Sequence, residues 1–276
     1  MARNLDKCQL VERSIHKTYR KTLWNPFIEG IKKYELIQEN DVIAVCISGG
    51  KDSILLAKLM QELQKHSDFP FQLKFLVMDP GYTEKNLNKI LSNAELLRIP
   101  VEVFTSDIFS VVDGQEKYPC YLCARMRRGY LYKYAKQMGC NKIALGHHFS
   151  DVVETTLMGM LWGGQIQGML PKLHSKNFEG MELIRPMYCI HEKDIINWRD
   201  YNELSFLNCA CKVTQKVEAQ GCETSKRAET KALIKELKKS NPNVEKSIFN
   251  SIHNVCLDMM VGYKKNDVEY SFLDEY

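Results

Sequence analysis

Residues 41 to 53 read DVIAVCISGGKDS, and this stretch decides the fold class of the chain. Its first part, Asp41–Ser48, is a nearly continuous apolar run, which is typical of a strand buried on both faces of a parallel sheet. Two glycines follow, and apolar residues then recur at helical spacing from Leu55 to Leu63. A buried strand, a glycine loop and a helix in direct succession predict the first unit of an α/β fold.

The same alternation of strand and helix continues along the chain. Further strands are predicted at 71–78, 101–104, 142–146 and 181–187. Helices are predicted at 9–38, 84–97, 122–138, from about 150, at 192–204 and at 225–239, and a loose tail or short hairpin at 258–276. Because parallel strands need crossover connections, this order predicts a parallel sheet with helices on both faces. We divide the chain into an N-terminal helical segment (1–40), a core (41–204) and a C-terminal, cysteine-containing helical extension (205–276).

The composition is that of an ordinary globular protein, with 45% hydrophobic residues. No apolar run approaches the roughly 20 residues that a membrane span needs. The first residues, MARNLDKCQLVERS, lack the apolar stretch of a secretory signal, so we expect a cytoplasmic protein without membrane contact. The net charge of 38 − 34 = +4 is too small to indicate nucleic acid. Basic clusters at 125–128 and 226–239 fit either a polyanion-binding surface or solvated helix faces.

The loop from Ser48 to Ser53 reads SGGKDS and is predicted to connect the buried strand to the helix. Backbone N–H groups at a helix N-terminus bind anions, and glycines let the backbone approach phosphate oxygens closely. Lys51 adds a positive charge, and the hydroxyl groups of Ser48 and Ser53 add hydrogen-bond donors. The loop therefore predicts a phosphate site, and the alternative is a tight turn without a ligand.

Two common phosphate-binding motifs are excluded by the sequence of this loop. A Walker loop has Gly-Lys-Ser/Thr at its end, whereas Asp52 follows the lysine here and Val45 stands where the first glycine is required. The dinucleotide fingerprint G-x-G-x-x-G is also missing, because Gly49 and Gly50 are adjacent.

Polar residues also follow two other predicted strands. Asp79 ends the second strand, and the segment GHHFSDVVET, which contains Gly146, His147 and Asp151, follows the fourth. Because ligands of open α/β sheets collect at the carboxyl ends of the strands, these residues are candidates to bind Mg²⁺, orient phosphate or act as acid and base. The alternatives are helix caps in the second segment and, for Asp79, a turn before Pro80.

Ten cysteines are many for a compartment where disulfides rarely persist. Cys120 and Cys123 form a Cys-x-x-Cys pair at the start of a predicted helix, and three arginines follow between 125 and 128. A helix N-terminus and nearby arginines favour thiolates, which metal sites require. Together with Cys209, Cys211 and Cys222, the pair fits a zinc site or an iron–sulfur cluster, and a redox dithiol is the third alternative.

The SGGKDS loop resembles the signature of the PP-loop ATP pyrophosphatases. The ordered set SGGKDS, PCYLCARMRRG, GHHFSDVVET and the segment from Gly163 to Lys172 resembles one family among them, the tRNA 2-thiocytidine synthetases, over about residues 15–256. This resemblance implies a Rossmann-like, adenine nucleotide alpha-hydrolase-like core at 41–204. It also implies an enzyme that cuts ATP between its α and β phosphates, adenylates a pyrimidine 2-oxygen and replaces it with sulfur, at cytidine 32 of tRNA.

The resemblance further implies a 4Fe-4S cluster held by three cysteines, with one iron left open for sulfide. Cys120 and Cys123 match the first two ligands. The family pattern has a second Cys-x-x-Cys, whereas this chain has Cys209-Ala210-Cys211. We expect Cys209 as the third ligand, with Cys211 as the reserve, and Cys222 to lie in an insertion.

The other site residues have roles in the mechanism that we hypothesise for such an enzyme. ATP and Mg²⁺ are expected on the loop Ser48–Ser53, with Lys51 and Ser53 neutralising the departing pyrophosphate. The remaining roles are nucleotide contacts for Asp79, Gly146 and His147, orientation of substrate or metal for Asp151, and binding of tRNA phosphate or the AMP charge for Arg127 and Arg128. Ser150 departs from the family, which usually has Asp there, and this weakens a two-aspartate metal site.

Two other functions stay open from the sequence. One is a related tRNA-modifying enzyme of the 2-thiouridine or lysidine type with a structural zinc site. The other is a nucleotide- or redox-sensing binding protein without turnover. The partners expected for the sulfur-transfer function are tRNA and a sulfur donor, either a cysteine desulfurase or free sulfide, and a homodimer is also open.

Overall fold

The computed structural model describes residues 5–106, 108, 119–207, 226–274 and 276. The chain divides into two compact units. Unit 1 comprises residues 1–151 and 170–223, and unit 2 comprises residues 152–169 and 224–276. The N-terminal segment 1–40 thus shares a compact unit with most of the segment 41–204.

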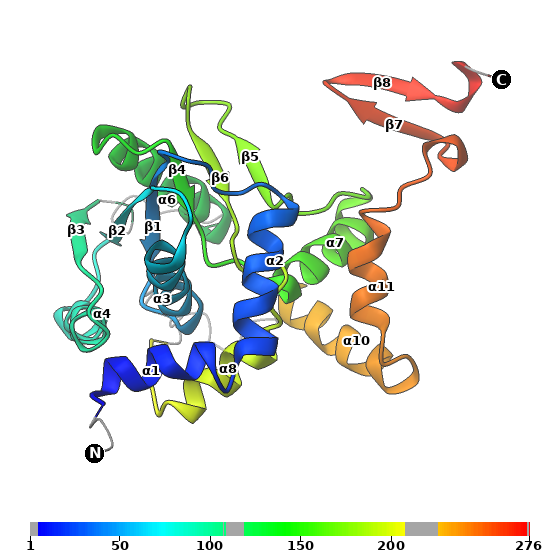
Figure 1. Ribbon diagram of the computed structural model, residues 1–276. Coiled ribbons are helices and arrows are strands. Elements are labelled where there is room, and N and C mark those ends of the chain that lie inside the picture. Colours follow the sequence, from blue (N-terminus) through cyan, green and yellow to red (C-terminus); the bar gives the residue numbers. More distant parts are fainter. Residues whose placement is uncertain (1–4, 107, 109–118, 208–225, 275) are drawn as a thin grey trace. The chain divides into compact units, whose positions relative to one another are not determined.

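A six-stranded sheet forms the centre of unit 1, with the strand order β3-β2-β1-β4-β6-β5 (Figure 1). Its strands are β1 (Val42–Ile47), β2 (Gln72–Asp79), β3 (Val101–Thr105), β4 (Lys142–Ala144), β5 (Lys172–His174) and β6 (Glu182–Ile184). All neighbouring pairs are parallel except β5 and β6, which are antiparallel. The predicted α/β class with a parallel sheet is confirmed, and the antiparallel edge strand β5 was not predicted.

The chain reverses its direction across the sheet at β1. From β1 it proceeds to β2 and β3 on one side, and it then returns to β4 on the other side of β1. In open α/β sheets such a reversal leaves a crevice beyond the carboxyl ends of the two central strands. The glycine loop leaves β1 at this point, and the segment GHHFSDVVET leaves β4 beside it.

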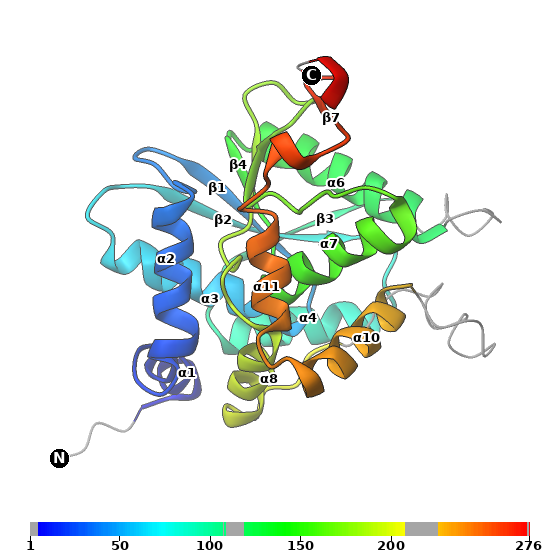
Figure 2. The same cartoon turned by 90° about the vertical axis from the view of Figure 1, so that its right-hand side faces the viewer.

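The strand β1 is buried on both faces, as its apolar run predicts. Ile43, Val45 and Ile47 pack into one hydrophobic cluster, whereas Ala44 and Cys46 pack into another. The first cluster includes residues of α1, α2, α3, α4 and α8, and the second includes residues of α6. Figure 2 shows α3 and α4 on one side of the strands and α6 on the other. This alternation follows from the two-residue period of a strand.

The helices of unit 1 match the predicted positions, with one difference. They are α1 (Lys7–His16), the π-helical turn η1 (Arg20–Trp24), α2 (Asn25–Lys33), α3 (Lys51–His66), α4 (Glu84–Leu96), α6 (Pro119–Gln137) and α8 (Glu192–Tyr201). The region predicted as helical over 9–38 is thus broken and ends earlier. The break lies in the turn at residues 17–19, between α1 and η1. Pro26 lies further on, in the first turn of α2, which follows η1 directly.

Unit 2 consists of short elements. The helix α7 (Phe149–Gly163) starts in unit 1 and supplies residues 152–163 of unit 2. The others are α10 (Lys226–Ser240), α11 (Val244–Ser251), the 3-10 turns η2 (Leu257–Met259) and η3 (Phe272–Asp274), and the antiparallel strands β7 (Gly262–Lys265) and β8 (Val268–Ser271). The short hairpin that was one of two alternatives for 258–276 is therefore present. Asn266 and Asp267 form its turn with positive φ angles, as a two-residue hairpin loop requires.

Among the described residues, no helix is both long enough and apolar enough to cross a bilayer.

Candidate nucleotide-binding site

A cavity of about 290 Å³ lies at the carboxyl ends of β1 and β4, where the chain direction reverses. It is lined by six residues of the two predicted segments, Ser48, Asp52, Ser53, Gly146, His147 and Asp151, and by Arg127 of α6. Met78 and Tyr82, which flank the end of β2, complete part of the wall. The structure thus brings the glycine loop and the segment after β4 together around one cavity.

Gly49 gives the loop its shape. Its φ of +83° lies in the left-handed region that favours glycine. A Cβ at this position would lie 2.5 Å from Cγ1 of Ile90, a buried residue of α4. Gly50 directly precedes the first residue of α3. The backbone N–H groups of the first turn of α3, which have no partner within the helix, therefore lie at the end of the loop. Such N–H groups form an anion site.

The two serines of the loop hold each other in place. The Ser53 hydroxyl oxygen accepts hydrogen bonds from the Ser48 backbone N–H at 3.1 Å and from the Ser48 hydroxyl at 3.2 Å. The Ser53 hydroxyl donates in turn to the Gly50 carbonyl at 3.0 Å. The two serines that were predicted to donate hydrogen bonds to phosphate therefore bond to each other within the loop, and both line the cavity.

Lys51 has two carboxylate partners. Its ammonium lies 3.1 Å from Oδ2 of Asp52 and 3.2 Å from Oε1 of Glu192, the first residue of α8. It lines a smaller cavity of about 100 Å³, together with Gly50, Asp52 and Arg199. Glu192 was not predicted as a site residue, because nothing in its local sequence signals contact with a loop that lies 141 positions away.

Gly146 permits close contact between the β4–α7 segment and the start of α3. A Cβ on Gly146 would lie 3.2 Å from both the carbonyl carbon of Asp52 and the backbone nitrogen of Ser53. At the same place, Nε2 of His148 lies 3.7 Å from Oδ1 of Asp52. Among the described residues, this Oδ1 is a buried carboxylate oxygen that accepts no hydrogen bond. It is therefore suited to a ligand that brings a positive charge.

Asp151 is both a helix cap and a cavity residue. The His148 backbone N–H donates to Oδ2 of Asp151 at 3.0 Å, and the Asp151 N–H donates to Nδ1 of His148 at 3.4 Å. These reciprocal bonds satisfy N–H groups at the start of α7, as in a capping box. Ser150 accepts a hydrogen bond from the Glu192 backbone N–H at 3.2 Å, which joins the starts of α7 and α8.

Asp79 forms a turn. Its Oδ1 accepts hydrogen bonds from the backbone N–H groups of Gly81 at 2.9 Å and Tyr82 at 2.7 Å. The turn brings Tyr82 to the wall of the cavity. The turn-forming alternative accounts for this geometry, and a contact between Asp79 and the nucleotide stays a prediction.

The helix α6 carries both predicted arginines and two predicted cluster ligands. Arg127 lines the cavity, whereas Arg128 and Arg125 are exposed. Cys120 and Cys123 lie three residues apart in the first turns of α6, so their backbone positions share one face of the helix. Cys209, Cys211 and Cys222 lie outside the described residues.

Burial alters two ionisable groups near the cavity. Cys46, on the cavity wall, is buried, and this burial raises the pKa of its thiol to about 12. Such a thiol is inert at neutral pH. Arg185, which was not predicted, follows β6, and its guanidinium donates to the Leu170 carbonyl. Burial lowers the pKa of Arg185 to about 10, so the group remains a cation at neutral pH.

Comparisons with known proteins identify the family of the chain. Residues 15–217 match the model of the PP-loop domain family. A tRNA-cytidine(32) 2-sulfurtransferase from Vibrio campbellii is 34% identical over 268 residues, which cover 94% of this chain and 84% of the relative. One from Francisella philomiragia is 35% identical and covers 89% of this chain and 94% of the relative.

A solved structure supports the fold. The U34-tRNA thiolase NcsA from Methanococcus maripaludis, determined with its 4Fe-4S cluster, superimposes with a TM-score of 0.66. The match covers 87% of this chain and 80% of the thiolase at 20% identity, so it bears on the fold alone.

Proposed function

Because the chain belongs to the PP-loop family of tRNA-cytidine(32) 2-sulfurtransferases, we propose that it uses ATP to replace the 2-oxygen of a tRNA cytidine with sulfur. The target proposed is the cytidine at position 32, which the names of the relatives specify. The observation that carries the proposal is the cavity where Ser48, Ser53 and the start of α3 meet the β4–α7 segment. A carbonyl oxygen is a poor leaving group. Its attack on the α-phosphate of ATP would release pyrophosphate and join the oxygen to AMP, and the oxygen would then leave as part of AMP when sulfur attacks the carbon.

The nucleotide is proposed to bind with its phosphates on the glycine loop. The cavity volume of about 290 Å³ lies near the lower end of the range for small-molecule pockets, roughly 300–1,000 Å³. Gly146 lacks a Cβ that would press on the backbone of Asp52 and Ser53, and Ser48 and Ser53 line the cavity. His147 also lines the cavity, and it is proposed to contact the nucleotide.

Two cations are proposed to balance the negative charge of the leaving pyrophosphate and of AMP. Lys51 begins α3, next to the backbone N–H groups of the helix start. Its present partners, Asp52 and Glu192, keep the ammonium beside the loop in a form that phosphate oxygens can recruit. Arg127 reaches the same cavity from α6 and offers a planar set of donors for a phosphate. Fixed charges of this kind stabilise a transition state without reorganisation.

The site offers oxygen ligands for Mg²⁺. Asp52 and Asp151 both line the cavity, and Oδ1 of Asp52 is buried and accepts no hydrogen bond from the described residues. Mg²⁺ prefers carboxylate and phosphate oxygens and usually binds through one or two carboxylates plus the phosphates of the substrate. We therefore assign the ion to Asp52, with Asp151 orienting the ion or the cytosine.

Cys120 and Cys123 are the first two ligands proposed for a 4Fe-4S cluster. Their spacing on the first turns of α6 fits a pair of thiolates at a helix N-terminus, where thiolates are favoured. Cys209 is the proposed third ligand and Cys211 its reserve. With three cysteine ligands, a 4Fe-4S cluster would have one iron without a protein thiolate and would supply the site of sulfur transfer. Because Arg127 of the same helix lines the cavity, α6 links the cysteine pair to the nucleotide site.

The macromolecular partners proposed are tRNA and a sulfur donor. Arg128 and Arg125 are exposed on α6 and are available to tRNA phosphates. A tRNA substrate would place the reaction in the cytoplasm. The sulfur donor proposed is free sulfide or a cysteine desulfurase, and a homodimer is a further proposal.

The function is tested by incubating the cluster-loaded protein with unmodified tRNA, ATP, Mg²⁺ and sulfide, followed by mass spectrometry of the nucleosides. We expect 2-thiocytidine from the unchanged protein and none from Cys123→Ala, whose ATP affinity stays within about twofold. Cys256→Ala is the control, because Cys256 is an exposed cysteine of unit 2. Thiolation by Cys123→Ala at the normal rate would exclude the cluster role. Zinc without iron–sulfur absorbance in anaerobically purified protein would favour the structural-zinc alternative.

A further inference from the structure

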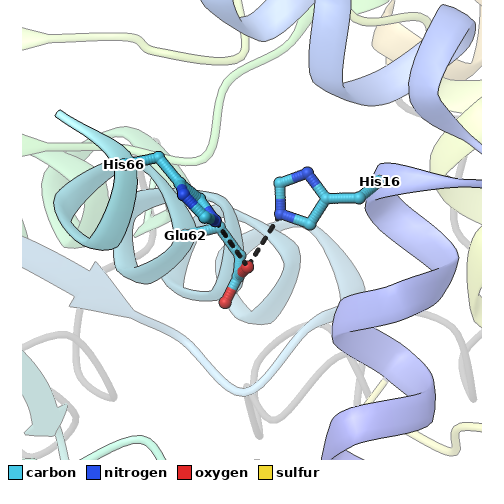
Figure 3. Close-up of side chains that lie close together, drawn as sticks. All are labelled: His16, Glu62 and His66. Carbon is cyan, nitrogen blue, oxygen red and sulfur yellow. Dashed lines mark hydrogen bonds and ion pairs between the residues drawn. The ribbon is translucent and has the colours of Figure 1, made fainter.

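A second group of candidate ligands lies at the far end of α3. His16 is the last residue of α1, His66 is the last residue of α3, and Glu62 precedes His66 by one helical turn. Figure 3 shows the carboxylate of Glu62 between the two imidazole rings. At 1.5 Å per residue, His66 lies about 22 Å along the helix from its first residue, Lys51. This group, which we term the two-histidine cluster, is therefore separate from the nucleotide site.

The three side chains converge on one point. Nε2 of His16 lies 2.7 Å from Oε2 of Glu62, and Nε2 of His66 lies 4.0 Å from the same oxygen. One ligand atom from each residue lies within 4.8 Å of those of the other two. The Glu62 side chain is only 5% exposed, whereas those of His16 and His66 are 24% and 60% exposed. The carboxylate is thus fixed, and His66 has room to adjust.

The donor set is that of a zinc site. Two imidazole nitrogens and one carboxylate oxygen are ligands of Zn²⁺ in proteins, with water in the fourth position. His16 and His66 border a cavity of about 670 Å³ from which water has access. The cluster also lies at the C-terminal ends of two helices, where the helix dipoles favour a cation. A hydrogen bond between His16 and Glu62 alone would not require a third donor one turn along α3.

The neighbouring lysine sets the competition for the carboxylate. Lys65 lies 2.6 Å from Oε1 of Glu62 and 3.0 Å from Oε1 of Glu12. It therefore occupies the oxygen that faces away from the histidines and leaves Oε2 to them. Because the Lys65 side chain is 52% exposed, it can leave Glu62 when a divalent cation arrives.

From these contacts we propose that His16, Glu62 and His66 form a binding site for Zn²⁺ or a similar first-row divalent metal, which fastens the end of α1 to the end of α3. The metal replaces the hydrogen-bonding proton between His16 and Glu62 and draws in His66 as the third ligand. Co²⁺ and Ni²⁺ accept the same nitrogen and oxygen donors and serve as probes.

Trp24 reports on the site. Its ring centroid lies 4.5 Å from that of His16, in an edge-to-face arrangement. A paramagnetic ion bound to His16 quenches the fluorescence of a tryptophan at this distance. The protein has two other tryptophans, so the contribution of Trp24 is obtained as the difference between the unchanged protein and Trp24→Phe.

In the test, the protein loaded with its 4Fe-4S cluster is titrated with Co²⁺ or Ni²⁺, and both the tryptophan fluorescence and the amount of bound Co²⁺ or Ni²⁺ are measured. We expect saturable quenching with one equivalent of metal. His66→Ala should weaken the affinity of the protein for the metal by about tenfold or more. Lys65→Ala should strengthen this affinity, because a competitor for Glu62 is removed. Trp24→Phe should abolish the quenching but keep the equivalent of metal.

His174→Ala is the matched control. His174 also faces a glutamate, with Nδ1 3.3 Å from Oε1 of Glu182, but among the described residues no third ligand joins that pair. This variant should bind the metal as the unchanged protein does. Equal affinity of His66→Ala and the unchanged protein would overturn the proposal. So would cobalt absorption of the thiolate type alone, because it would place all the metal on cysteines.

Discussion

Replacement of Gly49 by alanine would place a methyl group against the side chain of Ile90. The new Cβ would lie 2.5 Å from Cγ1 and 2.9 Å from Cδ1 of this buried residue, and the backbone φ of +83° would remain unfavourable. The left-handed conformation costs about 1–2 kcal/mol for a residue with a Cβ. Overpacking of a core adds about 1–3 kcal/mol. We therefore expect a loss of about 2–5 kcal/mol in the free energy of unfolding.

The two contributions can be separated with a second glycine. Gly139 also has a positive φ, +76°, but a Cβ there would meet no atom within 4 Å. Gly139→Ala should therefore lose only the backbone part, about 1–2 kcal/mol. In the double variant Gly49→Ala/Ile90→Ala the clash is relieved, so its loss should be smaller than the sum of the two single losses.

Urea unfolding of the four variants measures these losses, and calorimetry with ATP measures their effect on the loop. Gly49→Ala should weaken ATP binding, because a shifted loop no longer presents its N–H groups, whereas Gly139→Ala should leave the affinity unchanged. If Gly49→Ala unfolds no more easily than Gly139→Ala and binds ATP normally, the close packing of the loop against α4 is not what shapes the phosphate site.

Three further predictions concern other parts of the chain. Burial raises the pKa of the Cys46 thiol to about 12, so its thiolate fraction is negligible at about pH 8.5. Iodoacetamide should therefore label exposed Cys256 and leave Cys46 unmodified until the protein unfolds. Equal labelling rates of the two cysteines in the folded protein would contradict this. Lys58 is 1% exposed and lies 2.8 Å from Glu12, so Glu12→Gln leaves a buried cation without its counter-ion and should lower the free energy of unfolding in urea by about 3 kcal/mol or more. Glu269→Gln, in an exposed pair with Lys264, should change stability little. Equal losses in the two variants would refute the role of burial. Lys51→Ala should lower tRNA-dependent pyrophosphate release by about 100-fold. Glu192→Gln removes a competitor for the Lys51 ammonium and should tighten ATP binding up to about fivefold in calorimetry. Weaker ATP binding by Glu192→Gln would show instead that Glu192 helps to hold the nucleotide.

The sequence was informative where a local pattern reflects burial or backbone geometry. The apolar run before Ser48 predicted β1 because a central parallel strand has no solvent-facing side. The adjacent Gly49 and Gly50 predicted a close approach of the backbone to phosphate, which stays a prediction, whereas the clash of a Gly49 Cβ with Ile90 of α4 was not predicted. The edge strand β5 was missed because it has only three residues, two half-buried and one exposed, and carries no comparable signal.

Contacts between distant segments were beyond the sequence. The partner of Lys51, Glu192, begins a helix that the fold brings back to the loop, and no spacing rule connects the two. The His16–Glu62–His66 cluster joins the ends of two helices, and only the pair on α3 is visible as an i, i+4 spacing. The predicted helix 9–38 splits at residues 17–19, before Pro26, and no glycine or proline marks that turn in the sequence.

The position at which ATP is cut tests the central claim most directly. ATP labelled on its γ-phosphate is incubated with the cluster-loaded protein, Mg²⁺, sulfide and unmodified tRNA, and the labelled products are separated. Adenylation of the cytidine predicts labelled pyrophosphate in an amount that matches the 2-thiocytidine formed, and none without tRNA. Labelled orthophosphate as the first product, or thiolation without any cleavage of ATP, would contradict the proposed use of the glycine loop.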